Sequence, residues 1–185
     1  MSPIAKLSLV ALLSLPTVAL ADEVSDTLQS ALSAYEEGDI KYALEELEYA
    51  KQLMQSMKTA DLAKFLPEAP DGWTRDVSTE MNSGLAMLGG GAGAEATYTG
   101  DGNSFSITIM ADNPMVGALS GMMANAGLMG MKLERVGRMK FLNQDGELSG
   151  IVDGRILIQA SGADPEVMKP LLSEIDHRAL ENFGR

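Results

Sequence analysis

The segment TYTGDGNSFSITIM, residues 97–110, contains the clearest strand signal of the chain. Hydroxylated and apolar residues alternate over residues 104–109, as in a strand that has one solvated face and one buried face. The Asp-Gly pair at 101–102 precedes this run, and Asp-Gly is a strong signal for a two-residue hairpin turn. The segment therefore predicts a hairpin in which residues 95–99 pair with residues 104–110.

Two more Asp-Gly pairs follow the same logic. They lie at positions 145–146 and 153–154, between apolar or alternating runs. They predict that strand 148–152 pairs on one side with 138–142 and on the other side with 156–160. Sequential hairpins give a mostly antiparallel sheet without crossover connections.

A C-terminal helix is indicated after the last predicted strand. Asp164 is a suitable N-cap, and Pro165 suits the first helical position. Apolar residues then recur about every four positions, at Val167, Leu171, Ile175, Ala179 and Phe183. Pro170 cannot be accommodated in a regular helix interior, so either the helix restarts there or a separate turn precedes it.

Before the sheet, apolar residues recur at helical spacing in two runs. Gly38 suits the position after the first helix, and Asp39 suits the N-cap of the second. We therefore expect an αα-hairpin over residues 22–66, a proline-containing linker over 67–72 and a domain over 73–185. The predicted fold class is α+β: an N-terminal αα-hairpin, then a mostly antiparallel sheet with a C-terminal helix packed on it.

The run ALSAYEEGDIKYALEELEYAKQL, residues 31–53, resembles one tetratricopeptide-type helical pair. Tyr35 closes the first helix, and Ala43, Leu47 and Ala50 stand where that motif alternates small and bulky residues. The resemblance implies a helical hairpin and a protein-contact surface, although such repeats normally stack in arrays of three or more. The alternative is that the pair only packs on the rest of the domain.

In layout, the sheet and its helix resemble small secreted α+β domains of the Mog1/PsbP type. A helical hairpin before the segment LPEAPDGW, residues 66–73, is also similar to uncharacterised periplasmic proteins of proteobacteria. Neither resemblance rests on a functional motif, so neither assigns a role to any residue.

Residues 1–21 are typical of a cleavable export signal. Lys6 gives the positive start, residues 7–15 form a short apolar segment, and residues 19–21 end it with small residues at the positions that signal peptidase inspects. We predict cleavage after Ala21 and a periplasmic protein. The apolar segment is too short to span a membrane, so no stable membrane span is expected.

Composition excludes several classes of function. The chain of 185 residues has 26 acidic and 14 basic side chains, and its net charge of −12 argues against nucleic acid or anionic lipid surfaces as partners. It has no cysteine, which excludes disulfides and thiolate chemistry. Glu45, Glu46 and Glu48 in the second predicted helix form either a solvated face or a docking face for a basic partner.

No catalytic motif is apparent. The single histidine, His177, is predicted on the surface of the C-terminal helix. The spacing G-x-G-x-x-A at residues 91–96 precedes a strand-like segment, whereas a dinucleotide site needs a following helix. We therefore predict a non-enzymatic protein, with a hydrolase of unknown type as a distant alternative.

The distinctive feature is the abundance of methionine. Thirteen are present, and residues 113–131 carry no charge. Methionine suits adaptable apolar surfaces. We call this uncharged segment the methionine flap, and we predict that it and the helical hairpin bind a protein or an apolar ligand. The flap residues predicted to do so are Met115, Leu119, Met122, Met123, Met129 and Met131.

Two other interpretations of the methionines remain open. Thioether sulfur favours Cu(I), which Met122, Met123, Met129 and Met131 could bind in a periplasmic copper protein. No other cofactor is expected. Alternatively, the flap is only a glycine-rich cover that fills gaps on the open side of the sheet.

Overall fold

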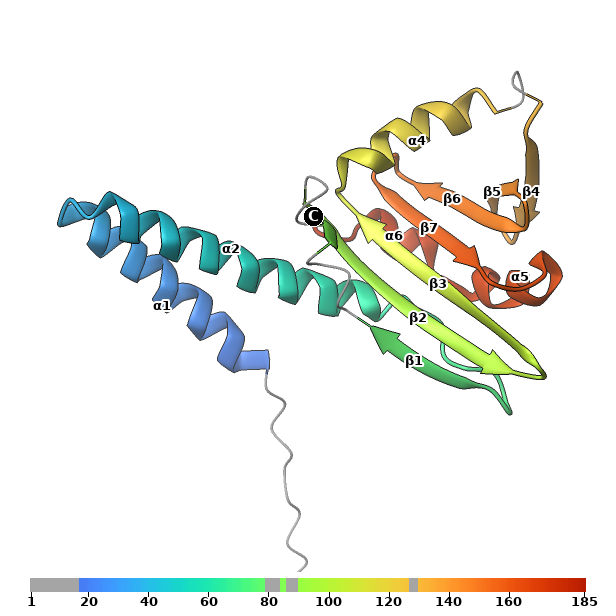
Figure 1. The fold of residues 1–185 in the computed structure, drawn as a ribbon, viewed down its shortest axis with the longest axis horizontal. Coiled ribbons are helices and arrows are strands. Elements are labelled where there is room, and N and C mark those ends of the chain that lie inside the picture. The colour runs from blue at the N-terminus through green and yellow to red at the C-terminus, as the bar shows by residue number, and fades with distance from the viewer. Residues whose placement is uncertain (1–16, 79–83, 86–89, 127–129) are drawn as a thin grey trace, which may run out of the picture. The chain divides into compact units, whose positions relative to one another are not determined.

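The computed structural model describes residues 17–78, 84–85, 90–126 and 130–185. The chain divides into two compact units, one that ends at Leu53 and one from Met54 to Arg185. Figure 1 labels their helices and strands. The predicted α+β fold is confirmed: two N-terminal helices precede an antiparallel sheet that has a helix packed near it.

The first unit contains α1, Thr17–Glu36, and most of α2, Ile40–Ala63. Gly38 has a φ of 86°, and the Asp39 N–H donates to the Ala34 carbonyl at 2.9 Å, which closes the end of α1. The Asp39 carboxylate then accepts from the Tyr42 N–H at 3.1 Å. The turn residues therefore act as the sequence predicts.

The second unit is built around one seven-stranded antiparallel sheet. Its spatial order is β1-β2-β3-β7-β6-β5-β4. The strands are β1 (Thr74–Ser78), β2 (Ala92–Gly100), β3 (Asn103–Ala111), β4 (Lys132–Val136), β5 (Met139–Gln144), β6 (Glu147–Val152) and β7 (Ile156–Ser161). Each of the three predicted Asp-Gly hairpins is present, as β2-β3, β5-β6 and β6-β7.

The Asp-Gly turns have the backbone that hairpins require. Asp101, Asp145 and Asp153 have φ values of 51°, 51° and 52°, and the glycine after each also has a positive φ. Positive φ at both positions gives the turn a twist that matches the strands it joins. In β2-β3 and β5-β6 the turn contains two residues between the last paired positions.

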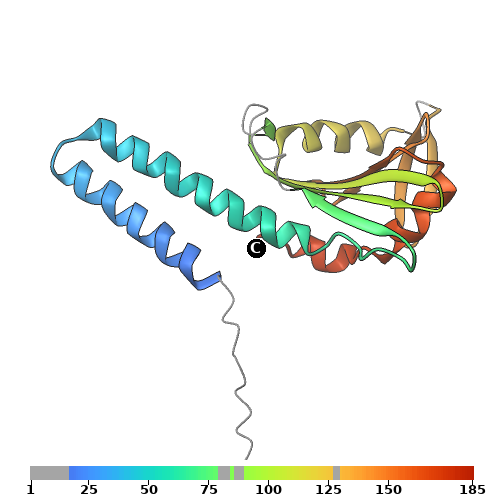
Figure 2. The ribbon, with the colours of Figure 1, turned by 60° about the horizontal axis from the view of Figure 1, so that its bottom comes forward.

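One face of the sheet carries the core. Phe105, Ile107 and Ile109 are buried on β3, as their alternation predicts, and they share a core cluster with Leu62 and Leu66 at the end of α2. The same cluster includes residues of α5, Pro165–Glu174, and α6, His177–Glu181. Figure 2 shows α5 and α6 on one side of the sheet and α4, Pro114–Ala124, on the other.

The C-terminal helix is divided, but not where the sequence suggests. Asp164 caps α5 by accepting from the Glu166 N–H at 2.8 Å, as predicted. Pro170 lies inside α5, and the break comes at Ile175, before Asp176 caps α6. Among the described residues, no helix is long and apolar enough to cross a membrane.

Glu134 ties β4 to its neighbours. Its carboxylate contacts Lys132 at 2.6 Å and Lys169 of α5 at 2.5 Å, and it accepts from the Asn143 amide at 2.6 Å. The hydrogen bonds from Lys132, Lys169 and Asn143 lower the pKa of Glu134 to about 2. The network fixes the β4-β5 hairpin to the helix packed on the sheet.

This network predicts how stability depends on pH. A carboxyl whose pKa is lower in the folded state contributes stability at neutral pH, and this contribution is lost as the pH falls toward the folded pKa. The difference in free energy of unfolding between the parent and Glu134→Gln should be constant above about pH 5 and shrink towards about pH 2. Urea unfolding at a series of pH values measures it. Glu147→Gln, whose carboxylate makes no ion pair in the described part of the chain, is the control. An equal difference at pH 3 and pH 7 would contradict the prediction.

Candidate binding sites on the hairpin and at the open end of the sheet

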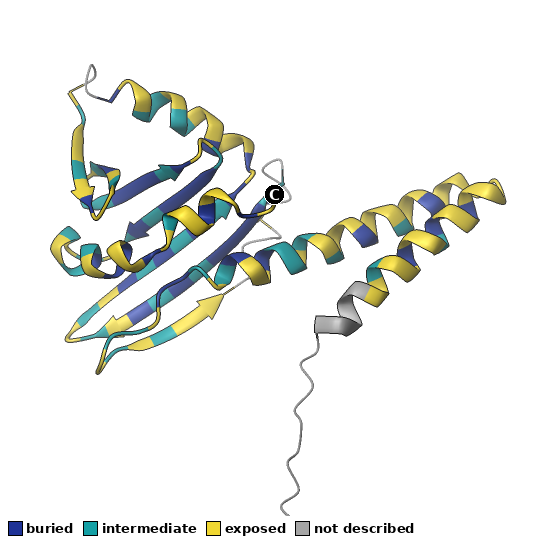
Figure 3. Ribbon diagram, turned by 180° about the vertical axis from the view of Figure 1, so that it is seen from behind, coloured by how far each residue is buried: buried dark blue, intermediate teal, exposed yellow. Residues whose placement is uncertain are grey.

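Small residues form the contact between the two helices of the first unit. The buried positions there are Thr27, Ala31, Ala34, Ala43 and Ala50. Such side chains let two helix backbones approach closely, but they bury little apolar area. Figure 3 accordingly shows the hairpin as mostly exposed, with few buried positions.

The large apolar side chains of the hairpin therefore remain exposed. Tyr35 is 65% exposed and Leu44 is 61% exposed. These side chains line a groove of about 380 Å³ together with Ala31 and Ala43. The six large residues of the groove are Leu28, Leu32, Tyr35, Ile40, Leu44 and Leu47. We call this surface the hairpin groove. Contiguous exposed apolar surface of this kind is typical of interaction sites.

The segment that contains the groove residues is rich in acidic side chains. Residues 22–53 include nine acidic and two basic side chains. Both lysines are paired within α2, Lys41 with Glu45 at 3.6 Å and Lys51 with Glu48 at 3.2 Å. The hairpin therefore combines an apolar face with a strongly negative charge.

A second candidate site arises where two strands of the sheet diverge. The β5-β6 register begins only at the pair Phe141↔Gly150, although β5 starts at Met139 and β6 continues to Val152. The sequence predicts pairing of residues 138–142 with 148–152, so the structure corrects the extent of this hairpin. The ends of the two strands border a cavity of about 770 Å³, which we call the sheet-end pocket.

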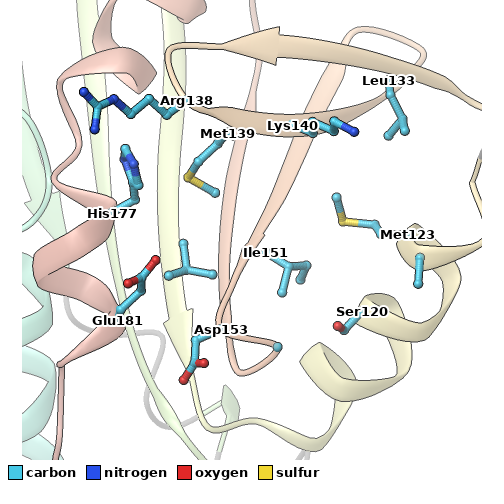
Figure 4. Close-up of a pocket in the computed structure, with 13 residues that line it drawn as sticks. Ser120, Met123, Leu133, Arg138, Met139, Lys140, Ile151, Asp153, His177 and Glu181 are labelled. Carbon is cyan, nitrogen blue, oxygen red and sulfur yellow. The ribbon is translucent and has the colours of Figure 1, made fainter.

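Three strands and two helices line the sheet-end pocket, and Figure 4 shows their side chains. Apolar side chains come from both diverging strands, with Met139 on β5 and Ile151 on β6. Leu133 of β4 and Met123 of α4 add to them, and His177 lies at the start of α6. The predicted surface histidine is in fact half-buried and belongs to this pocket.

The start of the β5-β6 ladder, next to the pocket, contains a glycine that has no room for a side chain. A Cβ atom at Gly150 would lie 2.7 Å from the Phe141 ring, so the ring occupies the space that a side chain would need. Phe141 is 1% exposed and cannot move aside freely. This contact is the first pair of the β5-β6 ladder, and the strands separate beyond it.

The charged side chains of the pocket are of two kinds. Asp153 is paired with Arg155 at 3.2 Å and with Arg185 at 2.5 Å. Arg138, Lys140 and Glu181 also line the pocket, and none of them makes an ion pair with another described residue. In Figure 4, Lys140 comes from β5, Arg138 from the turn before β5, and Glu181 from α6.

Helix α4 contains the predicted methionine flap and lies over the open face of the sheet (Figure 2). Val116 is 1% exposed, and Ser120 and Met123 line the pocket. These residues define the inward face of the helix. Met115, one of the predicted flap residues, precedes Val116 and is 59% exposed, so it lies off this face.

The structure brings only one of the predicted flap residues into the pocket, Met123. Leu119, Met122 and Met131 are half-buried outside its lining, and Met129 lies outside the described residues. No described group of three or more histidine, aspartate or glutamate side chains could hold a metal ion. Copper binding by methionine gains no support from this arrangement and stays a prediction.

Most of the pocket is not evident from the amino-acid sequence. Met139, Ile151 and His177 are separated by many positions in the chain, and no motif links them. One available signal was the cluster of basic residues in KLERVGRMK, residues 132–140, within an otherwise acidic chain.

The pocket does not contain an evident catalytic arrangement. Ser120 and His177 lie on opposite sides of it in Figure 4. The His177 imidazole makes no hydrogen bond to a hydroxyl or carboxylate among the residues that the structure describes. A nucleophile and its base need such contact, so the hydrolase alternative has no supporting geometry here.

Comparison of the chain with models of protein families, with curated proteins and with solved structures found no match.

The contact between Phe141 and Gly150 predicts the effect of a small substitution. Gly150→Ala should lower the free energy of unfolding by about 1–3 kcal/mol, the usual cost of overpacking a core. Denaturant unfolding measures this. Gly117→Ala is the matched control, since a Cβ there meets nothing within 4 Å. Equal stability of the two variants would contradict the contact.

Helix α4 should be less stable than its length suggests. Gly117 and Gly121 lie in its interior, although a Cβ atom at either position would meet nothing within 4 Å. A glycine there destabilises the helix by about 1 kcal/mol relative to alanine. Gly117→Ala and Gly121→Ala should each slow amide hydrogen exchange in α4 about fivefold. Gly146→Ala is the contrasting control, because it also meets nothing but has a φ of 90°, so it should destabilise its turn. Unchanged exchange in α4 would refute the prediction.

Proposed function

We propose that the protein is a non-enzymatic, periplasmic binding protein, and that its hairpin groove binds a cationic amphipathic helix of a partner protein. The observation that carries this proposal is the exposure of six large apolar side chains while alanines form the helix-helix contact. The hairpin thus has an apolar face that its own fold does not use.

A helix is the partner that fits this surface. The groove residues recur at three- and four-residue spacings on α1 (Leu28, Leu32, Tyr35) and α2 (Ile40, Leu44, Leu47). Two parallel or antiparallel ridges of this kind accept the ridge of a third helix. This matches the resemblance to a tetratricopeptide-type pair, whose neighbours normally cover such a face.

The negative charge of the hairpin indicates that its partner is positively charged. Nine acidic residues against two basic ones give residues 22–53 a net charge of −7, so a second copy of the hairpin would be repelled. A helix with lysine or arginine beside its apolar stripe would gain attraction and faster association. Glu45, Glu46 and Glu48, which the sequence leaves as either a solvated face or a docking face, lie on the same helix as Ile40, Leu44 and Leu47 of the groove.

The methionine flap is a further part of the proposal as predicted from the sequence. Met115 is 59% exposed beside a half-buried Leu119, so α4 presents some apolar surface of its own. The Cu(I) and hydrolase alternatives have no comparable observation in their favour.

The proposal predicts selective binding of a designed peptide. A helix of leucine and lysine with one apolar stripe should bind the full mature chain, and its scrambled isomer should not. Leu32→Gln with Leu44→Gln should weaken binding at least tenfold, since each buried leucine contributes about 1.5–3 kcal/mol. Fluorescence anisotropy measures the affinity.

Tyr42→Gln is the matched control, because Tyr42 is 45% exposed but does not line the groove. It should leave the affinity unchanged. Circular dichroism checks that helix content is the same in each variant. Equal binding of the scrambled peptide, or of the double variant, would show that the groove is not the site.

A further inference from the structure

We propose that the sheet-end pocket binds a single-chain amphiphile, an apolar chain with one anionic head group such as a long-chain carboxylate. This site is separate from the hairpin groove, and its ligand has the opposite charge. The proposal does not depend on the partner proposed for the hairpin.

The pocket has the size and lining that an apolar chain needs. Its volume of about 770 Å³ is within the range of about 300–1,000 Å³ usual for small-molecule sites. Met139 and Ile151 face it from strands that no longer pair, and Met123 closes it from α4. Two of these three are methionines, whose flexible side chains adapt to an apolar ligand.

Two basic side chains of the pocket have no acidic partner among the described residues. Nine of the thirteen described lysines and arginines make an ion pair. Among the described residues, those that do not are Arg135, Arg138, Lys140 and Arg178. Arg138 and Lys140 line the pocket. Unpaired cations at an apolar cavity favour an anionic group on its ligand.

The carboxylates of the pocket are compatible with an anionic head group on the β5 wall. Asp153 is already paired with Arg155 and Arg185. Glu181 is unpaired, but Figure 4 places it on α6, away from Lys140. A head group beside Lys140 on β5 therefore meets positive charge, while the carboxylates of the pocket lie on α6 and at the paired Asp153.

Access to the pocket is consistent with a soft cover. Gly117 and Gly121 weaken α4, and neither glycine is needed for a close contact. The cover can therefore move at low cost to admit a chain. Entry of the proposed ligand thus gives a reason for the two glycines in α4.

Three matched probes test the proposal: dodecanoate and dodecyltrimethylammonium, each below its critical micelle concentration, and dodecanol below its solubility limit. Isothermal titration calorimetry on the full mature chain should show the carboxylate binding at least tenfold more tightly than the alcohol, and the cation more weakly still. In protein with labelled methionine methyl groups, dodecanoate should shift the signals of Met123 and Met139 but not that of Met54 in α2.

Variants separate the pocket from general charge effects. Arg138→Gln with Lys140→Gln should weaken dodecanoate binding about tenfold or more and leave dodecanol binding unchanged, because only the head group loses its partners. Arg178→Gln is the matched control, since it removes an equally unpaired charge outside the pocket lining. Leu32→Gln with Leu44→Gln in the hairpin groove should also have no effect.

Several results would overturn the inference. These are equal affinity for the carboxylate and the alcohol, an equal loss of binding in Arg178→Gln, or loss of binding in the hairpin variant instead. Absence of binding by all three probes would overturn it as well. None of these results bears on the peptide test of the hairpin groove, so the two proposals can fail separately.

Discussion

The register of the antiparallel sheet is the constraint on which the second unit depends. Side chains alternate between the two faces of a strand, so a shift of one residue would exchange the core face for the solvated face. The Asp101-Gly102 turn, with positive φ at both residues, fixes this register in β2-β3. One face then carries Phe105 and its apolar neighbours, while hydroxyl groups meet on the other, as in the 3.1 Å contact between Thr97 and Ser106.

The same register also determines where the sheet can open. In β5-β6 the turn at Asp145-Gly146 sets the pairing, and the ladder proceeds until the Phe141 ring covers Gly150. Beyond this pair each strand remains bonded to its other neighbour, β5 to β4 and β6 to β7. The pocket is therefore not a defect of packing. It is the space left when two well-formed hairpins separate at one end.

Local signals explain which parts could be predicted from sequence. The Asp-Gly turns, the alternation over residues 104–109 and the Gly38-Asp39 turn each act through nearby residues, and each is confirmed. The phase of α4 and the end of the β5-β6 ladder depend on distant contacts, such as Phe141 with Gly150. In the hairpin, the periodic apolar stripes were visible, but they do not show whether leucine or alanine forms the contact. Alanine does, and the leucines remain exposed.

Charge distribution then separates the two apolar sites from each other. A net charge of −12 argues against anionic partners for the surface as a whole, yet it does not describe residues 132–140, where four basic residues accompany one acidic residue. The hairpin groove is apolar with a negative surrounding, and the sheet-end pocket is apolar with unpaired positive charge. Apolar burial alone would let either site accept either ligand, because the hydrophobic effect is not directional. We propose that the sign of the nearby charge distinguishes a cationic helix at the groove from an anionic amphiphile at the pocket.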